Sequence, residues 1–179
     1  MNILAIILIV LAILVALFLL VALFVKKEYA IERETTINKP KQEVFDYIKL
    51  IKNQSIYNKW WLADPAARKK YQGTDGTVGF VAAWDSDDKK VGKGEQELKK
   101  ITEGERIDYE LRFIKPFEGK ADAHMTTNAT PENQTTVRWG FSSRMKYPMN
   151  IMLLLMNLEG MLAKDLEASL RNLKGTLEK

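Results

Sequence analysis

The sequence predicts an α+β fold in which an antiparallel sheet is combined with one long helix, and in which a separate apolar helix comes first. Three observations predict it. Residues 3–25 are all apolar, without a charge, a glycine or a proline. From about residue 68 to residue 145, apolar and polar residues alternate between turn sequences, as in antiparallel strands. Residues 149–178 repeat apolar residues at helical spacing.

The apolar segment 3–25 is long enough to cross a membrane. As a helix it would be about 35 Å long at roughly 1.5 Å per residue, and the hydrocarbon core of a bilayer is about 30 Å thick. A cleaved signal peptide is the alternative, but only Met1 and Asn2 come before the segment, and the sequence at 23–27 suits cleavage poorly. We therefore expect residues 1–28 to form a single-pass transmembrane anchor with a short linker.

Positive charge follows this segment directly. Lys26 and Lys27 come immediately after it. Because Lys and Arg are enriched on the cytoplasmic side of membrane proteins, this bias predicts that the C-terminal part lies in the cytoplasm. The formal net charge is +4, and the basic clusters are interleaved with acids. A mixed, solvated surface is the first interpretation, and attraction to anionic lipid head groups is the alternative. No basic stripe or reader motif indicates a nucleic-acid partner.

Residues 29–179 are expected to form one domain of ordinary size. Residues 29–37 alternate and are rich in β-formers, which predicts a first strand. A helix then begins near Pro40 and carries apolar residues at helical spacing up to Ile51. A second short helix is expected at residues 56–61.

Six further strands are expected between residues 68 and 145. They lie at about residues 68–72, 78–84, 90–101, 106–113, 120–130 and 134–143. The clearest is 106–113, where apolar and charged residues alternate strictly, as in a half-buried strand. Gly92 and Gly94 indicate a bend or a bulge in their strand.

The chain is expected to end in one continuous helix at about 149–178. A strand, two helices, six strands and a long final helix are the elements of the helix-grip fold in this order. In that fold a curved sheet wraps around the final helix and encloses an elongated apolar cavity.

Short segments spread over residues 29–179 also carry a family resemblance. They are residues 38–45, 77–79 with Trp84, 91–94, 136–140, 147–150 and 166–174. In this order they resemble the START-like (SRPBCC) superfamily, in the polyketide cyclase/dehydrase and lipid-transport group. The resemblance implies a ligand-binding cavity and a hydrophobic small molecule or lipid as partner. It does not choose among binding, transport, cyclisation and protein interaction, and the anchor lies outside the usual family pattern.

Large side chains that are expected to point from the strands toward the final helix are the candidates for lining the cavity. They are Phe80, Trp84, Tyr109, Phe113 and Trp139, with Met152 and Met156 from the final helix. Apolar pockets are lined mainly by such residues, although ordinary core packing is the alternative for each of them.

The cavity entrance is expected near Trp60, Trp61 and Phe117. Two adjacent tryptophans cannot both point inward from a short helix, so one of them is expected to be exposed or to lie at the head-group region, which tryptophan favours. An entrance formed by these residues would then face the bilayer.

Candidates for catalysis are few. His124 is the only histidine, and an enzyme of the cyclase or dehydrase type would need it, Asp122, Tyr109 or Arg138 inside the pocket. The sequence lacks cysteine, a convincing metal-ligand cluster and a nucleophile elbow, so we expect no metal or cofactor. Membrane-anchored binding or transport of a lipophilic molecule is the leading hypothesis. A cyclase-like enzyme and a protein-interaction or stress-response module with a filled core remain as alternatives.

Overall fold

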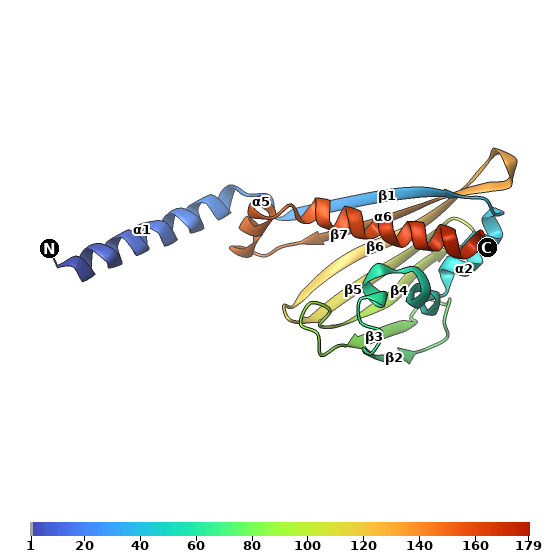
Figure 1. Cartoon of the computed structure of the whole chain (residues 1–179), viewed down its shortest axis with the longest axis horizontal. Helices are drawn as coiled ribbons and strands as arrows, with labels where there is room; N and C mark the ends of the chain where they lie inside the picture. Colours follow the sequence, from blue (N-terminus) through green and yellow to red (C-terminus); the bar gives the residue numbers. More distant parts are fainter. Residues whose placement is uncertain (1) are drawn as a thin grey trace.

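The computed structural model describes residues 2–179. Helix α1 (Ile3–Phe24) projects from one end of a domain built around a long twisted sheet (Figure 1). Asn2 caps α1, since its side chain accepts a hydrogen bond of 2.9 Å from the backbone N–H of Leu4. Almost every side chain of α1 is exposed, and Ala22 near its end is the buried exception. The helix is long and apolar enough to cross a membrane, a property that signal sequences share.

Seven antiparallel strands form one sheet, which confirms the predicted strand content. They are β1 (Glu28–Ile37), β2 (Arg68–Gln72), β3 (Val81–Asp85), β4 (Lys93–Thr102), β5 (Arg106–Lys115), β6 (Gly119–Thr130) and β7 (Gln134–Arg144). Their order across the sheet is β1-β7-β6-β5-β4-β3-β2. Strand β3 is shorter than the predicted strand at 78–84, because Gly79 adopts a positive φ of 89° and ends the extended conformation there.

The faces of the sheet follow the predicted alternation. In β5, Ile107 and Tyr109 are buried on the inner face, whereas Arg112 lies on the outer face among the carboxylates of Glu95, Glu97 and Glu110. The register of β4 against β5 shifts at Lys93/Gly94, so the predicted irregularity near the strand glycines is confirmed.

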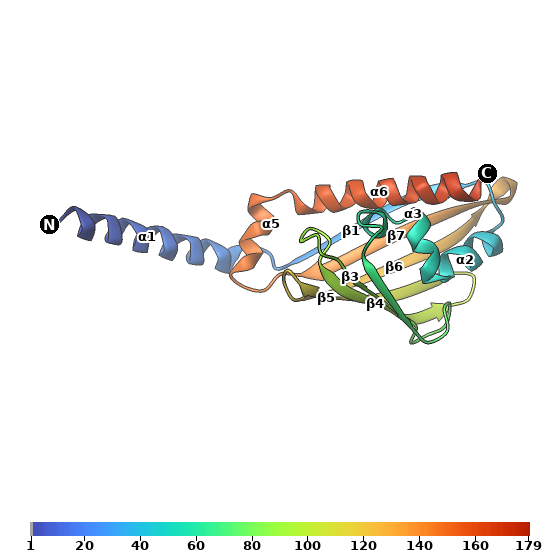
Figure 2. The ribbon, with the colours of Figure 1, turned by 60° about the horizontal axis from the view of Figure 1, so that its bottom comes forward.

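Helices cover the inner face of the sheet. They are α2 (Lys41–Lys49), α3 (Gln54–Tyr57), α4 (Lys59–Leu62), α5 (Met152–Leu155) and α6 (Leu158–Leu177), with the 3-10 turns η1 (Ile51–Asn53), η2 (Pro131–Asn133) and η3 (Met149–Ile151). Helix α6 runs along the sheet (Figure 2) and buries Leu166, Leu170 and Leu173 in the core. This arrangement is the predicted helix-grip, START-like fold.

The prediction of one continuous helix at 149–178 is wrong. The chain leaves helical geometry at Met156, which has an extended ψ of 133°, and α6 begins again after Asn157. The side chain of Asn157 accepts a hydrogen bond of 3.0 Å from the N–H of Gly160, and asparagine is among the preferred helix N-caps. The break directs η3 and α5 away from α6 and toward α1 (Figure 2).

The antiparallel register gives the sheet two distinct ends. Strand β1 begins at the end where α1 joins it, and Glu28 there pairs with Arg144 at the end of β7. By the same alternation, the β3–β4 loop (86–92) and the β5–β6 loop (116–118) lie at this end. We call it the α1 end.

Candidate functional site

A cavity of about 530 Å³ lies at the α1 end, between the sheet, α4 and the start of α6. Six aromatic side chains line it: Trp60, Trp61, Trp84, Phe113, Phe117 and Phe141. Smaller apolar side chains complete it: Ala63, Ala67, Val91, Leu111, Pro116 and Leu162. Charged residues, among them Lys69, Lys90 and Lys115, also contribute to its lining. A concave site of this size with aromatic walls suits a lipophilic ligand.

Trp84 is the centre of the aromatic wall. Its ring lies 6.2 Å from that of Trp61 and 6.2 Å from that of Phe113, in edge-to-face geometry with both. Gly94 on the neighbouring strand makes room for it, because a Cβ there would lie 2.5 Å from the Trp84 ring. The Trp84 indole N–H donates to the carbonyl of Val91 at 3.3 Å, which ties the ring to the β3–β4 loop.

The two adjacent tryptophans of α4 both contribute to the wall. Trp60 contacts Trp139 and Phe141, each at 6.3 Å between ring centres, and its indole N–H donates to the carboxylate of Asp165 at 3.2 Å. Trp61 turns toward Trp84 instead. Both side chains are half-buried, so neither is fully exposed, and a position of one ring at the head-group region stays a prediction. Helix α4 has only one turn, and both of its tryptophans line the cavity: Trp60 on the side of Trp139 and Phe141, and Trp61 on the side of Trp84.

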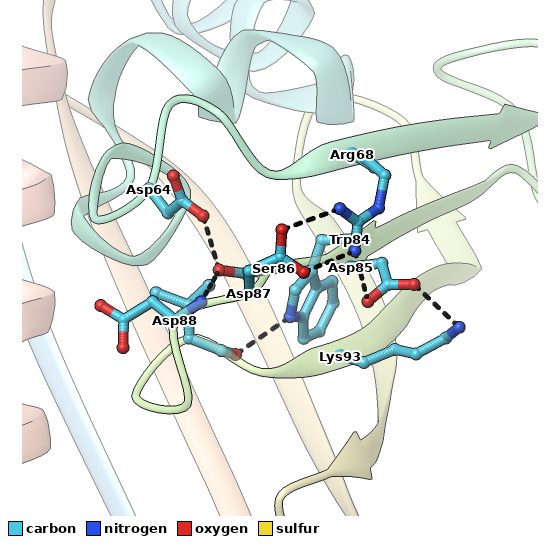
Figure 3. A network of polar contacts seen from close by, with 9 residues as sticks. Asp64, Arg68, Trp84, Asp85, Ser86, Asp87, Asp88 and Lys93 are labelled. Atoms are coloured by element: carbon cyan, nitrogen blue, oxygen red, sulfur yellow. Dashed lines mark hydrogen bonds and ion pairs between the residues drawn. The ribbon is translucent and has the colours of Figure 1, made fainter.

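A polar network holds the loop at the cavity rim (Figure 3). Arg68 donates two hydrogen bonds of 3.0 Å to the carboxylate of Asp87. The hydroxyl of Ser86 donates to Asp64 and accepts from the backbone N–H of Asp88 at 2.9 Å. The Arg68 guanidinium beside Asp87 holds the pKa of that carboxyl below its usual value.

Two neighbouring loops approach each other closely at this rim. Gly92 has a positive φ of 65°, and a Cβ on it would lie 2.1 Å from the carbonyl oxygen of Lys115. Only glycine therefore allows the β3–β4 loop to lie against the end of β5.

Gln96 is the polar side chain deep in the cavity wall. It lies on the inner face of β4 and is only 4% exposed. Asn58 also lines the cavity, but its amide donates to Gln54 and its oxygen caps α4. Among residues 2–179, no hydrogen-bond partner is found for the Gln96 side chain. The polar atoms of the Gln96 amide are not fully enclosed by protein, so they face the cavity, where they can meet water or a polar atom of a ligand.

The predicted site residues separate into three groups. Trp84, Phe113 and the entrance residues Trp60, Trp61 and Phe117 meet around the cavity. Phe80, Tyr109 and Trp139 belong to the closed core. Met152 and Met156 do not line the cavity, because the chain breaks between α5 and α6, and Met156 is exposed.

Most lining residues are absent from the sequence-based set, among them Gln96, Leu111, Phe141 and Leu162. The alternation of β4 places Gln96 on the same face as Gly94 and Leu98. That alternation was therefore a usable signal for an inward-facing amide.

The residues of the enzyme hypothesis do not meet. His124 lies on the outer face of the sheet, where its Nε2 is 3.0 Å from Glu32, and Asp122 is exposed on the same face. Arg138 pairs with Glu34 there. Tyr109 is buried on the inner face, where its hydroxyl donates to the carbonyl of Ile48 at 3.3 Å. Burial strongly raises the pKa of this phenol.

A second hollow, of about 610 Å³, lies on the outer face beside the start of β1. Its lining is largely charged, and several of these charges are paired, as in Lys26 with Glu159 at 2.6 Å. It is therefore a polar surface groove, and the aromatic cavity is the better candidate for a ligand site.

No protein-family model matches the sequence, and no curated protein matches it. Solved structures do match its fold. Protein CV1439 from Chromobacterium violaceum is 14% identical, with a TM-score of 0.59 over 84% of this chain and 97% of that one. Ara h 8.0201 has the same identity, TM-score and coverage. Aha1 from Colwellia psychrerythraea, solved as a dimer, is 16% identical, with a TM-score of 0.57 over 84% of this chain and 96% of that one. These are START-like helix-grip folds. At such identities the likeness establishes the fold alone.

Proposed function

We propose that the protein binds a hydrophobic small molecule or lipid beside a membrane, with residues 1–28 as anchor and residues 29–179 as the binding domain. One observation carries the proposal: the aromatic cavity lies at the end of the sheet from which the apolar helix α1 emerges. A ligand that leaves the bilayer would find Phe117 and Trp61 within reach of the membrane surface. Domains of this fold typically bind hydrophobic ligands, which agrees with the proposal.

Contacts at the end of α1 favour an anchor that is retained over a signal sequence that is removed. The side-chain amide of Asn150 donates to the carbonyls of Ala22 and Val25, at 2.7 and 2.9 Å. Asn150 is fully buried. Cleavage after residue 25 would leave this amide without these partners. The basic pair Lys26 and Lys27 supports a cytoplasmic location of the domain.

The lining favours a ligand that is mainly apolar and carries an oxygen-containing group. The aromatic wall would bury the apolar part, and the Gln96 amide would donate to or accept from the polar group. Three lysines, Lys69, Lys90 and Lys115, outnumber the two aspartates Asp64 and Asp88 in the lining, so an anionic head group would be tolerated better than a cationic one.

Mass spectrometry of lipids that co-purify with the full-length protein tests the proposal. Ala67→Trp fills the cavity, whereas Ala66→Trp places the same side chain on the neighbouring exposed residue. We expect a lipophile at close to one molecule per chain in the wild type and in Ala66→Trp, and a loss of at least several-fold in Ala67→Trp. Equal recovery from both variants, or no lipophile from the folded wild type, would contradict the proposal.

A further inference from the structure

An exposed apolar surface lies directly beside α1. It is formed by the segment 147–161, which includes η3 and α5, and it presents Tyr147, Met149, Leu154, Leu155, Met156 and Met161. Leu154 and Leu155 are 65% and 67% exposed, although both are large aliphatic side chains. Several exposed large apolar side chains within one short segment are typical of a surface that contacts a membrane or another protein.

The segment is fixed to the last turns of α1. The hydroxyl of Tyr147 donates to the carbonyl of Leu19 at 3.3 Å. Asn150 donates to the carbonyls of Ala22 and Val25, as described above. The position of the segment along the axis of α1 is therefore set by hydrogen bonds to specific residues.

These contacts set the depth of the segment in a membrane. A hydrocarbon core of about 30 Å accommodates roughly 20 helical residues. If the core begins at Ile3, it ends near Ala22. The Tyr147 hydroxyl contacts Leu19 and would then lie roughly 4.5 Å inside this boundary, near the interface that tyrosine favours.

We propose that the segment 147–161 lies in the head-group region of the bilayer as a second membrane contact beside α1. The inference rests on α1 crossing the membrane, which is part of the proposed function, but it does not depend on a ligand. Lys146 precedes the segment and Lys27 follows α1, whereas Lys26 is paired with Glu159 of the segment itself. The charge of Lys146 and Lys27 complements anionic head groups at the same level. A lipid surface therefore accounts for both the apolar residues and the charges around them.

This second contact fixes how the domain faces the membrane. A single helix followed by a free linker would let the domain rotate. With the segment 147–161 immersed, the α1 end is held at the surface. Phe117, which is 76% exposed on the β5–β6 loop at that end, is then directed toward the lipid.

Site-specific fluorescence in lipid vesicles tests the inference. The chain has no cysteine, so single labels can be introduced without removing one. The full-length protein is placed in vesicles of phosphatidylcholine and phosphatidylglycerol and labelled at Leu155→Cys. Asn133→Cys, in the β6–β7 turn at the opposite end of the sheet, is the matched control. Leu14→Cys in the middle of α1 reports whether that helix is in the bilayer.

We expect a nitroxide attached to the lipid to quench the label at 155 at least threefold more strongly than the label at 133, and iodide in water to show the reverse order. Equal quenching at 155 and 133 would overturn the inference. Protection of 155 from both quenchers would also overturn it, because a second copy of the chain would then cover the surface. If the label at 14 escapes lipid quenching, the anchor itself fails. Lipid recovery from the cavity is a separate measurement and tests the ligand independently.

Discussion

Replacement of Gln96 by leucine should separate stability from ligand binding. The side chain lies in the cavity wall at 4% exposure, and no partner is found for its amide among residues 2–179. Leucine is similar in size and removes only the polar group. The ligand-free protein should therefore become more stable, whereas the complex should lose a contact.

The magnitude follows from the two roles of the amide. An unpaired buried polar group costs about 1–3 kcal/mol. The Gln96 amide is not fully enclosed and faces a cavity of about 530 Å³ that can hold water, so we expect a gain of at most about 1 kcal/mol. For a domain of this size that is roughly 2–4 °C in Tm. Loss of one hydrogen bond to the ligand, about 1 kcal/mol, should weaken binding about fivefold.

Thermal unfolding of the delipidated protein in detergent measures the first effect, and titration with the lipid identified by mass spectrometry measures the second. Gln72→Leu is the control, because it makes the same chemical change at an exposed position of the edge strand β2. A fall in Tm for Gln96→Leu, together with unchanged affinity, would refute the assignment of Gln96 as a ligand contact.

Three further predictions concern the scaffold. Asn150→Ala removes two hydrogen bonds to the end of α1, so the free energy of unfolding should fall by about 1–3 kcal/mol. Proteolysis between α1 and β1 should become faster. An unchanged rate of cleavage would contradict a rigid connection between α1 and the domain. Gly94→Ala should lower Tm by several degrees because its Cβ meets the Trp84 ring, whereas Gly175→Ala, in open space on α6, should raise it slightly. Hydrogen bonding from Arg112 lowers the pKa of Glu110 below 4.5, so this stabilisation is present above that pH and is lost as the pH falls through the lowered pKa. The free energy of unfolding, measured with urea as the pH is lowered, should therefore decrease less in Arg112→Met than in the wild type.

The sheet could be predicted from the sequence because its signal is local. Alternation with a period of two identifies strands and their inner faces, as in β5, and antiparallel pairing then brings alternate loops to one end. Trp84, Phe113 and Phe117 lie close together because the strand ends and the loop that carry them are at the same end of the sheet. The break before α6 was not predicted, because apolar residues continue at helical spacing through Met156 and conceal the cap at Asn157.

The difference between cavity wall and core depends on position along the strands, which alternation does not report. Tyr109 and Phe113 share the inner face of β5. Tyr109 lies farther from the α1 end, where α2 and α3 fill the space above the sheet, and its hydroxyl reaches Ile48. Phe113 lies beyond that cover and borders the cavity. Only the three-dimensional arrangement of the helices separates these two roles.

The close approach at Gly92 has a consequence for ligand exchange. No side chain separates the 86–92 loop from the carbonyl of Lys115, and the same loop is joined to Arg68 and Asp64 by ionic and hydroxyl contacts. We therefore expect the 86–92 loop and the 116–118 loop to move together. If the cavity binds a ligand as proposed, a bulky ligand that widens the entrance would have to displace both loops together. Its dissociation rate would then depend on the contact between the loops as well as on the aromatic wall.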